Sequence, residues 1–176
     1  MANRDTVETL EYKGFSIEIE QDQSPSSSRD WDNVGTMTCW HRNYILGDEN
    51  GRKEYGSPED FKEHLAGISK DDEEFENMSE EDFNTEMDKR ITEKYVVLPL
   101  VLFDHSGISM STSRNGYPFN CPWDSGKVGW IWVTKEKAAA EYGLDQAAEN
   151  FVEEVENRLR SEVSIYDDYI QGNVYG

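Results

Sequence analysis

The chain has 176 residues, of which 36% are hydrophobic, 31% charged and 12% aromatic, and its formal net charge is −20. This length suits one domain, residues 1–176, whose core needs neither disulfides nor a metal, and the aromatic content excludes a disordered chain. The acidic excess repels nucleic acid and anionic lipid, so we expect no direct nucleic-acid binding.

Targeting signals are missing from the sequence. Residues 1–14 lack the apolar core of a signal peptide, and no run of about 18 apolar residues occurs. Cys39 and Cys121 are too few and too far apart for a disulfide framework. We therefore expect a cytoplasmic protein with two free, buried thiols, no membrane contact and no cofactor.

Hydrophobic periodicity predicts the first half of the fold. Period-two alternation predicts a strand over 14–20, and Thr and aromatic residues predict a second strand over 34–41. Capping-box pairs at 57–60 and 79–82 mark the starts of two helices.

The second half is expected to supply three strands and two helices, at 95–103, 108–113, 127–133, 135–142 and 144–161. The run 95–103 is apolar throughout, which is typical of a central strand, and Pro99 within it predicts a bulge. The tail, 163–176, is expected to close as a strand or hairpin. Together the elements predict an α+β fold: a single, mainly antiparallel sheet with helices packed on one face, and an acidic surface.

Charge is unevenly distributed along the chain. Segment 71–93 holds 11 acids against two basic residues, a net charge of −9, whereas segment 95–135 carries +1. Three interpretations remain open: a solvated face, adaptation to a high-salt cytoplasm, or mimicry of a phosphate backbone that a basic partner would recognise.

The high-salt interpretation makes a prediction about stability. Because salt screens the mutual repulsion of the acids, the melting temperature should rise as KCl is increased from low to molar concentration. A melting temperature that stays level or falls would favour a specific basic partner instead.

Three polar loops, DWDN at 30–33, DHSG at 104–107 and CPWDSG at 121–126, each adjoin a predicted core strand. A metal or acid-base site would draw on the carboxylates and imidazoles of Asp30, Asp32, His41, Asp104, His105 and Asp124. In that case Asp104, His105 and Asp124 are the catalytic candidates. A second interpretation is that Asp104 and Asp124 accept N–H bonds of their own turns. In a third, the aromatic side chains of Trp31, Tyr117 and Trp123 line a binding groove.

Of these, we predict capped turns and no bound metal, because a Ser-Gly pair follows both Asp104 and Asp124. Calorimetric titration of chelator-treated protein with Mg, Mn and Zn would measure whether a metal binds. Stoichiometric binding that is lost on Asp104→Asn and Asp124→Asn would instead support a hydrolase.

Four stretches resemble a group of small uncharacterised proteins of phages, archaeal viruses and other mobile elements. They are DWDNVGTMTCWHRNYILGD (30–48), VLPLVLFDHSGISMST (97–112), CPWDSGKVGWIWVTKEKAAAEYG (121–143) and YDDYIQGNVYG (166–176). The resemblance implies an origin and carries over no reaction or catalytic residue. We expect a viral or mobile-element accessory protein that binds a host protein, with anti-defence action or nucleic-acid mimicry through its acidic surface. A small metal-dependent hydrolase and a minor virion component are the alternatives.

Overall fold

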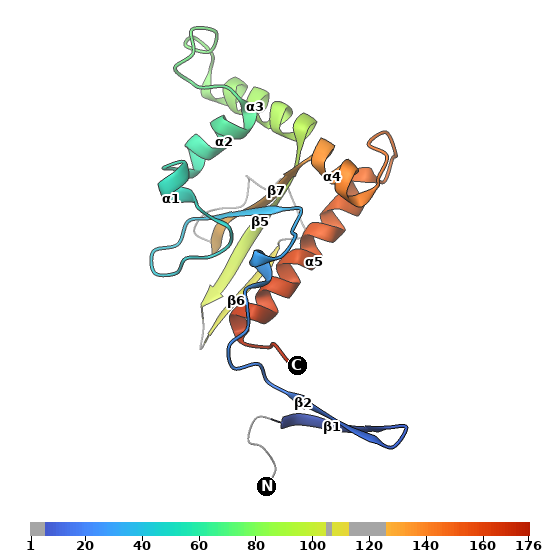
Figure 1. Ribbon diagram of the computed structural model, residues 1–176. Helices are drawn as coiled ribbons and strands as arrows, with labels where there is room; N and C mark the ends of the chain where they lie inside the picture. The colour runs from blue at the N-terminus through green and yellow to red at the C-terminus, as the bar shows by residue number, and fades with distance from the viewer. Residues whose placement is uncertain (1–5, 105–106, 113–125) are drawn as a thin grey trace.

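The computed structural model describes residues 6–104, 107–112 and 126–176. Five strands form the main sheet, in the order β4-β3-β7-β5-β6, and β1 and β2 form a separate hairpin (Figure 1). The strands are β1 (Thr6–Tyr12), β2 (Phe15–Glu20), β3 (Thr36–Cys39), β4 (Glu49–Asn50), β5 (Tyr95–Asp104), β6 (Ile108–Thr112) and β7 (Lys127–Thr134). The helices are the 3-10 turn η1 (Ser28–Asp30) and α1 (Gly51–Glu54), α2 (Pro58–Ala66), α3 (Glu80–Lys94), α4 (Lys135–Tyr142) and α5 (Phe151–Gln171). The predicted α+β class is confirmed.

Antiparallel pairing dominates the main sheet. β7 pairs with β3 on one side and β5 on the other, and β5 pairs with β6, all antiparallel. Pairing between β3 and β4 is parallel. The expectation of a mainly antiparallel sheet is therefore confirmed, with one short parallel edge.

β5 is the buried central strand that its apolar run predicts. Residues 96–100 are all buried. The pairing with β6 begins at Leu100, so the missing N–H of Pro99 costs no hydrogen bond between β5 and β6. The bulge predicted at Pro99 is absent, because Pro99 pairs in register with Trp130; the pairing instead shifts between Leu100 and Val101, where the extra residue, Val128, belongs to β7.

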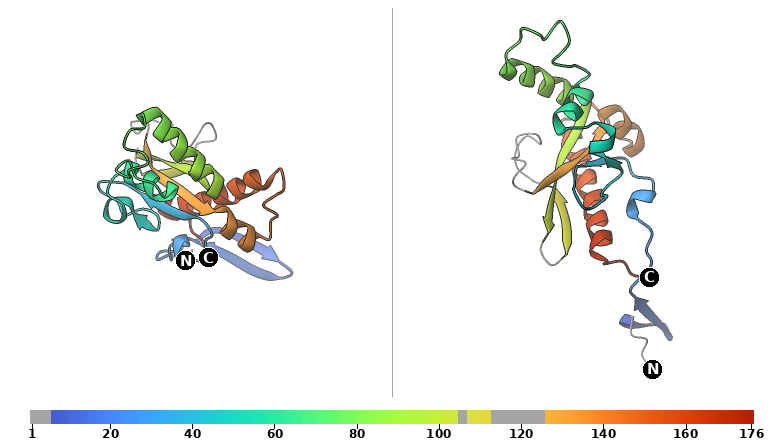
Figure 2. Two further views of the ribbon diagram at one scale, coloured as in Figure 1. Left: turned by 90° about the horizontal axis from the view of Figure 1, so that it is seen from above. Right: turned by 90° about the vertical axis from the view of Figure 1, so that its left-hand side faces the viewer.

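Helices cover both faces of the sheet (Figure 2). On one face α5 buries Phe151, Val155 and Leu159 against the apolar side chains of β5 and β7. On the other, α2 and α3 contribute Phe61 and Ile91 to a cluster with strand residues; that cluster comprises Trp40, Phe61, Leu65, Ile91, Val97 and Trp130. The packing of α5 on one face is as predicted. The sequence did not predict that α2 and α3 would cover the other face.

Both predicted capping boxes lie at helix starts. The Ser57 hydroxyl accepts the Asp60 N–H at 3.1 Å, and the Asp60 carboxylate accepts the Ser57 N–H at 3.0 Å. At α3, the Ser79 hydroxyl accepts the Asp82 N–H at 3.1 Å. These local bonds satisfy N–H groups that have no partner within the helix.

Three sequence-based assignments are corrected by the structure. The strand expected at 14–20 pairs with β1 in the hairpin and does not join the main sheet. The helix expected at 144–161 begins at Phe151, because the Asp145 carboxylate accepts the Ala147 N–H at 2.9 Å and holds the preceding segment in turns. α5 then runs on to Gln171, through most of the tail expected to be a strand or hairpin.

A buried guanidinium joins η1, β3 and α5. The Arg29 side chain, 4% exposed, donates to Asp48 at 2.6 Å, to Glu162 at 3.1 Å and to the Gly35 carbonyl at 2.6 Å. Asp48 also accepts the Met37 N–H at 2.7 Å. Burial lowers the pKa of Arg29, but the bonds with Asp48 and Glu162 outweigh it and the net shift is upward. The cluster thus holds the start of β3 against α5.

The packing of α5 makes a prediction that compares neighbouring residues. Phe151 is 3% exposed, whereas Val152 is 43% exposed. Phe151→Ala should lower the free energy of unfolding by about 3–5 kcal/mol because it opens a cavity under α5. Val152→Ala, the matched control, should change it by about 0.5 kcal/mol or less. Urea titrations would measure both, and equal midpoints for the two variants would contradict this placement of α5.

Candidate functional site

Among the described candidate residues, His41 and Asp104 lie at one end of the sheet, and the DWDN loop lies elsewhere. His41 follows β3 and Asp104 ends β5, and both lie near the start of β7, where these antiparallel strands meet. Asp30 and Asp32 precede the opposite end of β3, so the DWDN loop does not join them. The remaining predicted site residues fall outside the described part of the chain: His105, Tyr117, Trp123 and Asp124, together with Cys121.

The DWDN loop forms a turn held by its own side chains. The Asn33 amide donates to the Ser28 carbonyl at 2.8 Å and to the Trp31 carbonyl at 3.0 Å. Trp31 is 63% exposed. Asn33 therefore ties this loop through its own amide N–H groups, while the turns that follow Asp104 and Asp124 include residues outside the described ranges and stay predictions.

A multi-ligand metal centre is not assembled by the described residues. Within residues 6–104, 107–112 and 126–176, no three His, Cys, Asp or Glu side chains lie close enough to share an ion. Of the four described members of the set proposed from the sequence, Asp30 and Asp32 lie before β3, while His41 and Asp104 lie beyond its other end. No described helix is both long and apolar enough to cross a membrane.

Beside His41 and Asp104, at this end of the strands, the surface forms a cavity of about 480 Å³. Its walls come from the segment after β3, from α1, from the start of α2 and from the facing ends of β5 and β7. The lining residues are Trp40, His41, Arg42, Asn43, Arg52, Gly56, Pro58, Leu102, Asp104, Gly126, Lys127 and Val128. We call this the sheet-end pocket. Among the described lining residues, Arg42, Arg52 and Lys127 are cationic and Asp104 is acidic, in a chain whose net charge is −20.

A β-bulge turns Lys127 toward this pocket. Between the pairs Leu100↔Gly129 and Val101↔Lys127, Val128 has no partner on β5. Val128 consequently packs in the core under α5, while the Lys127 ammonium lies 4.4 Å from the Trp130 ring centroid on the opposite face. In an unbroken strand Lys127 would share the face of Ile131, in the apolar core. Bulges commonly redirect a side chain beside a functional site.

Trp40 forms a fixed wall of the sheet-end pocket. Its indole N–H donates to the Gly56 carbonyl at 2.9 Å, and its ring packs edge-on to Trp130 at 5.5 Å. A Cβ added at Gly51 would lie 2.2 Å from the Trp40 ring, so that position has no room for a larger residue. The position of the Trp40 ring is therefore fixed by contacts within the fold.

His41 presents a defined hydrogen-bond donor. Its Nδ1 accepts the backbone N–H groups of Asn43 at 3.2 Å and Tyr44 at 3.1 Å, and its ring stacks on Tyr44 at 4.8 Å. Because Nδ1 serves as the acceptor, the neutral imidazole carries its proton on Nε2.

A larger cavity, of about 680 Å³, lies between α2, α3 and the start of α4. Its charged lining is mixed in sign, and Arg90 there is held by Glu86 at 2.6 Å. Such a balanced surface favours no charged ligand, so the smaller sheet-end pocket is the stronger candidate.

Two buried polar groups near the sheet have structural roles. Burial, with a smaller contribution from Asp48, raises the pKa of the Cys39 thiol to about 12, so this thiol stays protonated and unreactive at neutral pH. Thr38 is completely buried and donates to Glu49 at 2.7 Å while accepting the Trp132 indole N–H at 2.9 Å. The expected burial of Cys39 is confirmed.

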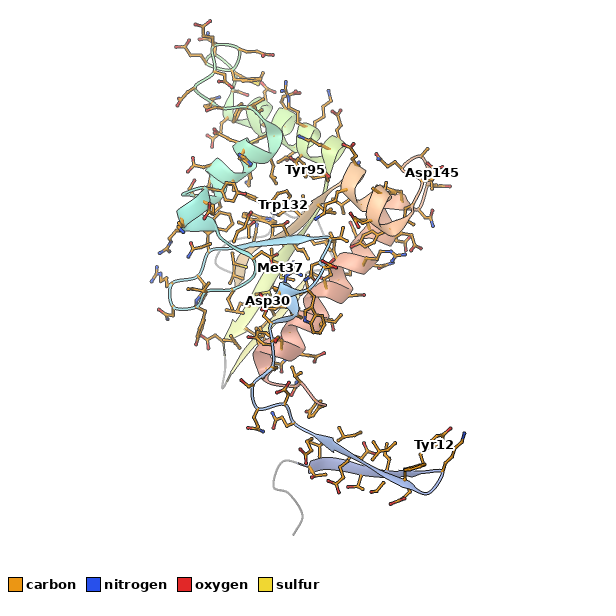
Figure 3. The ribbon with its side chains drawn as sticks, viewed as in Figure 1. Tyr12, Asp30, Met37, Tyr95, Trp132 and Asp145 are labelled. Atoms are coloured by element: carbon orange, nitrogen blue, oxygen red, sulfur yellow. The ribbon has the colours of Figure 1, made fainter. Side chains whose placement is uncertain are left out.

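The second notable surface is the hairpin, which projects from the body of the protein (Figure 3, where Tyr12 is labelled at its tip). Lys13 and Gly14 have φ of 50° and 84°, so a tight turn with two left-handed residues joins the strands. The pairs Leu10↔Ile17 and Tyr12↔Phe15 lie on the same side, since paired residues share a face and alternate pairs lie on alternate faces. Their exposed fractions are 44% and 45% for the first pair and 60% and 73% for the second.

These four side chains, Leu10, Tyr12, Phe15 and Ile17, form what we call the hairpin face. The opposite side of the hairpin is polar and carries Thr9, Glu11, Ser16 and Glu18. An isolated two-stranded hairpin has little stability of its own in water, and a contiguous exposed apolar surface commonly marks an interaction site.

Sequence analysis missed the most distinctive side chains of both surfaces. Arg42, Arg52 and Lys127 come from three separate segments and match no motif, although the positive charge of segment 95–135 was a partial signal. The alternation at 14–20 would have indicated the hairpin face if residues 6–12 had been recognised as the partner strand.

Comparisons with protein-family models, with curated proteins and with solved structures give no match to this chain.

Proposed function

We propose that the chain is an accessory protein of a virus or mobile element that acts by binding a basic host protein, with the hairpin face as its contact. The observation that carries this proposal is the one-sided apolar hairpin: four large side chains gathered on one face and exposed by 44% to 73%.

A basic partner is favoured over a second copy of the chain on grounds of charge. The hairpin strands and turn hold four glutamates and one lysine, a net charge of −3, and the whole chain carries −20. Two copies would therefore repel each other, whereas an apolar patch rimmed by Lys and Arg would match both the face and its acidic surroundings.

The mounting of the hairpin also supports a binding role. The N–H of Glu20 donates to the Gly176 carbonyl at 3.1 Å, the N–H of Asp22 donates to the Val174 carbonyl at 2.8 Å, and the Gln21 amide donates to the Gly172 carbonyl at 2.8 Å. The root of the hairpin is thus fixed to the end of α5 while its apolar face stays uncovered by the described residues. A preorganised surface loses less conformational freedom on binding.

The acidic segment 71–93 offers a second contact for the same class of partner. Most of its carboxylates are exposed on α3 and the preceding turns, at the end of the molecule opposite the hairpin (Figure 1). Under this proposal those charges attract a basic partner and raise its association rate, while the hairpin face supplies most of the affinity.

A hydrolase receives no comparable support. Among the described candidates, Asp30 and Asp32 are separated from His41 and Asp104 by the length of β3, and a reaction would need groups to converge on one point.

The test combines photo-crosslinking with purified binding. A photoreactive residue at position 15 should crosslink a basic protein in host-cell lysate, and that protein, once purified, should bind the chain directly. Leu10→Ser with Phe15→Ser should weaken this binding by about 100-fold or more, because both side chains lie at the centre of the proposed contact. Ile45→Ser is the matched control, since Ile45 is an 88% exposed apolar residue on the body. Binding should also weaken as KCl rises.

Two results would contradict the proposal. Equal binding by the hairpin double variant and the Ile45→Ser control would show that the face is not the contact. Sedimentation showing a dimer that the hairpin variant abolishes would identify a second copy as the occupant.

A further inference from the structure

From the outer edge of β2 we infer that the partner binds by strand addition: an extended segment of the partner pairs with β2 as a third strand of the hairpin. The inference rests on the proposed function, in which a basic protein contacts the hairpin, and it names the form of that contact. β1 pairs with one edge of β2, and the described residues leave the other edge unpaired over residues 15–19.

A third strand already begins beside the root of β2. Glu20 and Gly176 exchange both backbone hydrogen bonds, at 3.1 and 3.0 Å, and Gln21 forms an antiparallel bridge with Tyr175. The described pairing on this side ends at Glu20. An added segment that runs antiparallel to β2 would continue the same ladder from Glu20 toward the tip of the hairpin.

The bonds of Glu20 show which backbone groups of β2 point to this side. Because the N–H and C=O groups of successive residues alternate between the two edges of a strand, those of Ser16 and Glu18 point the same way as those of Glu20. Both residues are exposed, and neither makes a backbone hydrogen bond on this side with a residue that the structure describes. Each therefore offers one donor and one acceptor to an added strand.

The edges of β1 and β6 are less suited to accept a strand. On β1 the extra residue Val7 forms a bulge, and bulges disrupt the ladder that an added strand would extend. At β6 the Asp167 carboxylate of α5 accepts the Met110 N–H at 2.7 Å and occupies a donor that an added strand would need. The described pairing of β2 has its bulge on the other strand, and neither Pro nor Gly interrupts residues 15–19.

The two faces of the hairpin define the side chains of the added segment. On one face the segment would lie beside Phe15 and Ile17, which suit apolar side chains. On the other it would lie beside Ser16 and Glu18, and the charges of Glu18 and Glu11 there suit Lys or Arg. The occupant is therefore an extended segment of about five residues in which apolar and basic residues alternate. A second copy of β2 would bring its own Glu18 to the acidic face, and like charges on paired strands repel.

A peptide probe tests the pairing on the full chain. The acetylated and amidated peptide Lys-Val-Lys-Val-Lys-Val-Lys is titrated to millimolar concentration while amide hydrogen exchange is followed by NMR. In the free chain the Ser16 and Glu18 amides should exchange rapidly, whereas the Asp22 amide, bonded to the Val174 carbonyl, should exchange slowly. Bound peptide should slow exchange at Ser16 and Glu18 by about tenfold or more. The counterpart with Glu in place of Lys should have no effect, because its charge repels that of the hairpin.

Methylation of single backbone amides then identifies the edge. Segment 1–38 can be synthesised and ligated to Cys39, so that one amide carries a methyl group and every side chain is kept. N-methylation at Glu18 removes an outward N–H and should weaken peptide binding by about tenfold or more. N-methylation at Thr9 is the matched control, because Thr9 pairs with Glu18 and its N–H points outward from the β1 edge. Thermal melting of both methylated chains verifies folding.

Five results would overturn the inference. Slow exchange at Ser16 and Glu18 in the free chain would show that the edge is already occupied. Unchanged exchange at millimolar peptide, or equal affinities of the two methylated chains for the peptide, would remove strand addition at β2. Equal effects of the two peptides would remove the basic occupant. Protection that grows with protein concentration alone, with a dimer in sedimentation, would identify a second copy as the occupant.

These results are distinct from failure of the proposed function. The crosslinked partner can bind through the hairpin face without adding a strand, and the double variant Leu10→Ser with Phe15→Ser tests that contact. Loss of partner binding in the double variant, together with equal peptide binding by the two methylated chains, would remove the added strand and keep the hairpin face as the contact.

Discussion

The buried guanidinium of Arg29 is the interaction on which the arrangement of the other elements depends. It contacts a carboxylate from the β4 side and another from α5, and it also donates to the backbone at the start of β3. Removing one partner of such a cluster leaves a charge without compensation in the interior, which typically costs about 3–5 kcal/mol. β3 has four residues and needs this external hold. Because β3 leads directly into Trp40 and His41, the position of the sheet-end pocket depends on the same cluster.

Net charge is a poor guide to the chemistry of an individual surface of this protein. The net charge of −20 matches the acidic character of α3 and the turns before it, whereas the described lining of the sheet-end pocket contains Arg42, Arg52 and Lys127 beside Asp104. The two regions lie on different parts of the fold, so each presents its own local field.

Local signals in the sequence predicted local structure well. The starts of α2 and α3 were predicted because Ser57 and Ser79 bond to N–H groups three residues away, within one turn of chain. The start of α5 was missed because periodicity extends back to Leu144, whereas the Asp145 turn interrupts the helix before Phe151. The pocket was missed for a different reason: its cations become neighbours through strand pairing and a bulge, and neither leaves a spacing pattern in the sequence.

The mounting of the hairpin on α5 has a mechanical consequence. The root of the hairpin bonds to residues 172–176, which follow α5 directly, and α5 in turn holds Arg29 through Glu162 and the β6 edge through Asp167, whose carboxylate accepts the Met110 N–H at 2.7 Å. The hairpin is therefore joined, through residues 172–176, to a helix of 21 residues that also contacts the centre of the protein. A partner bound at the hairpin would in this way act on the end of α5 first, and through α5 on Arg29 and the β6 edge.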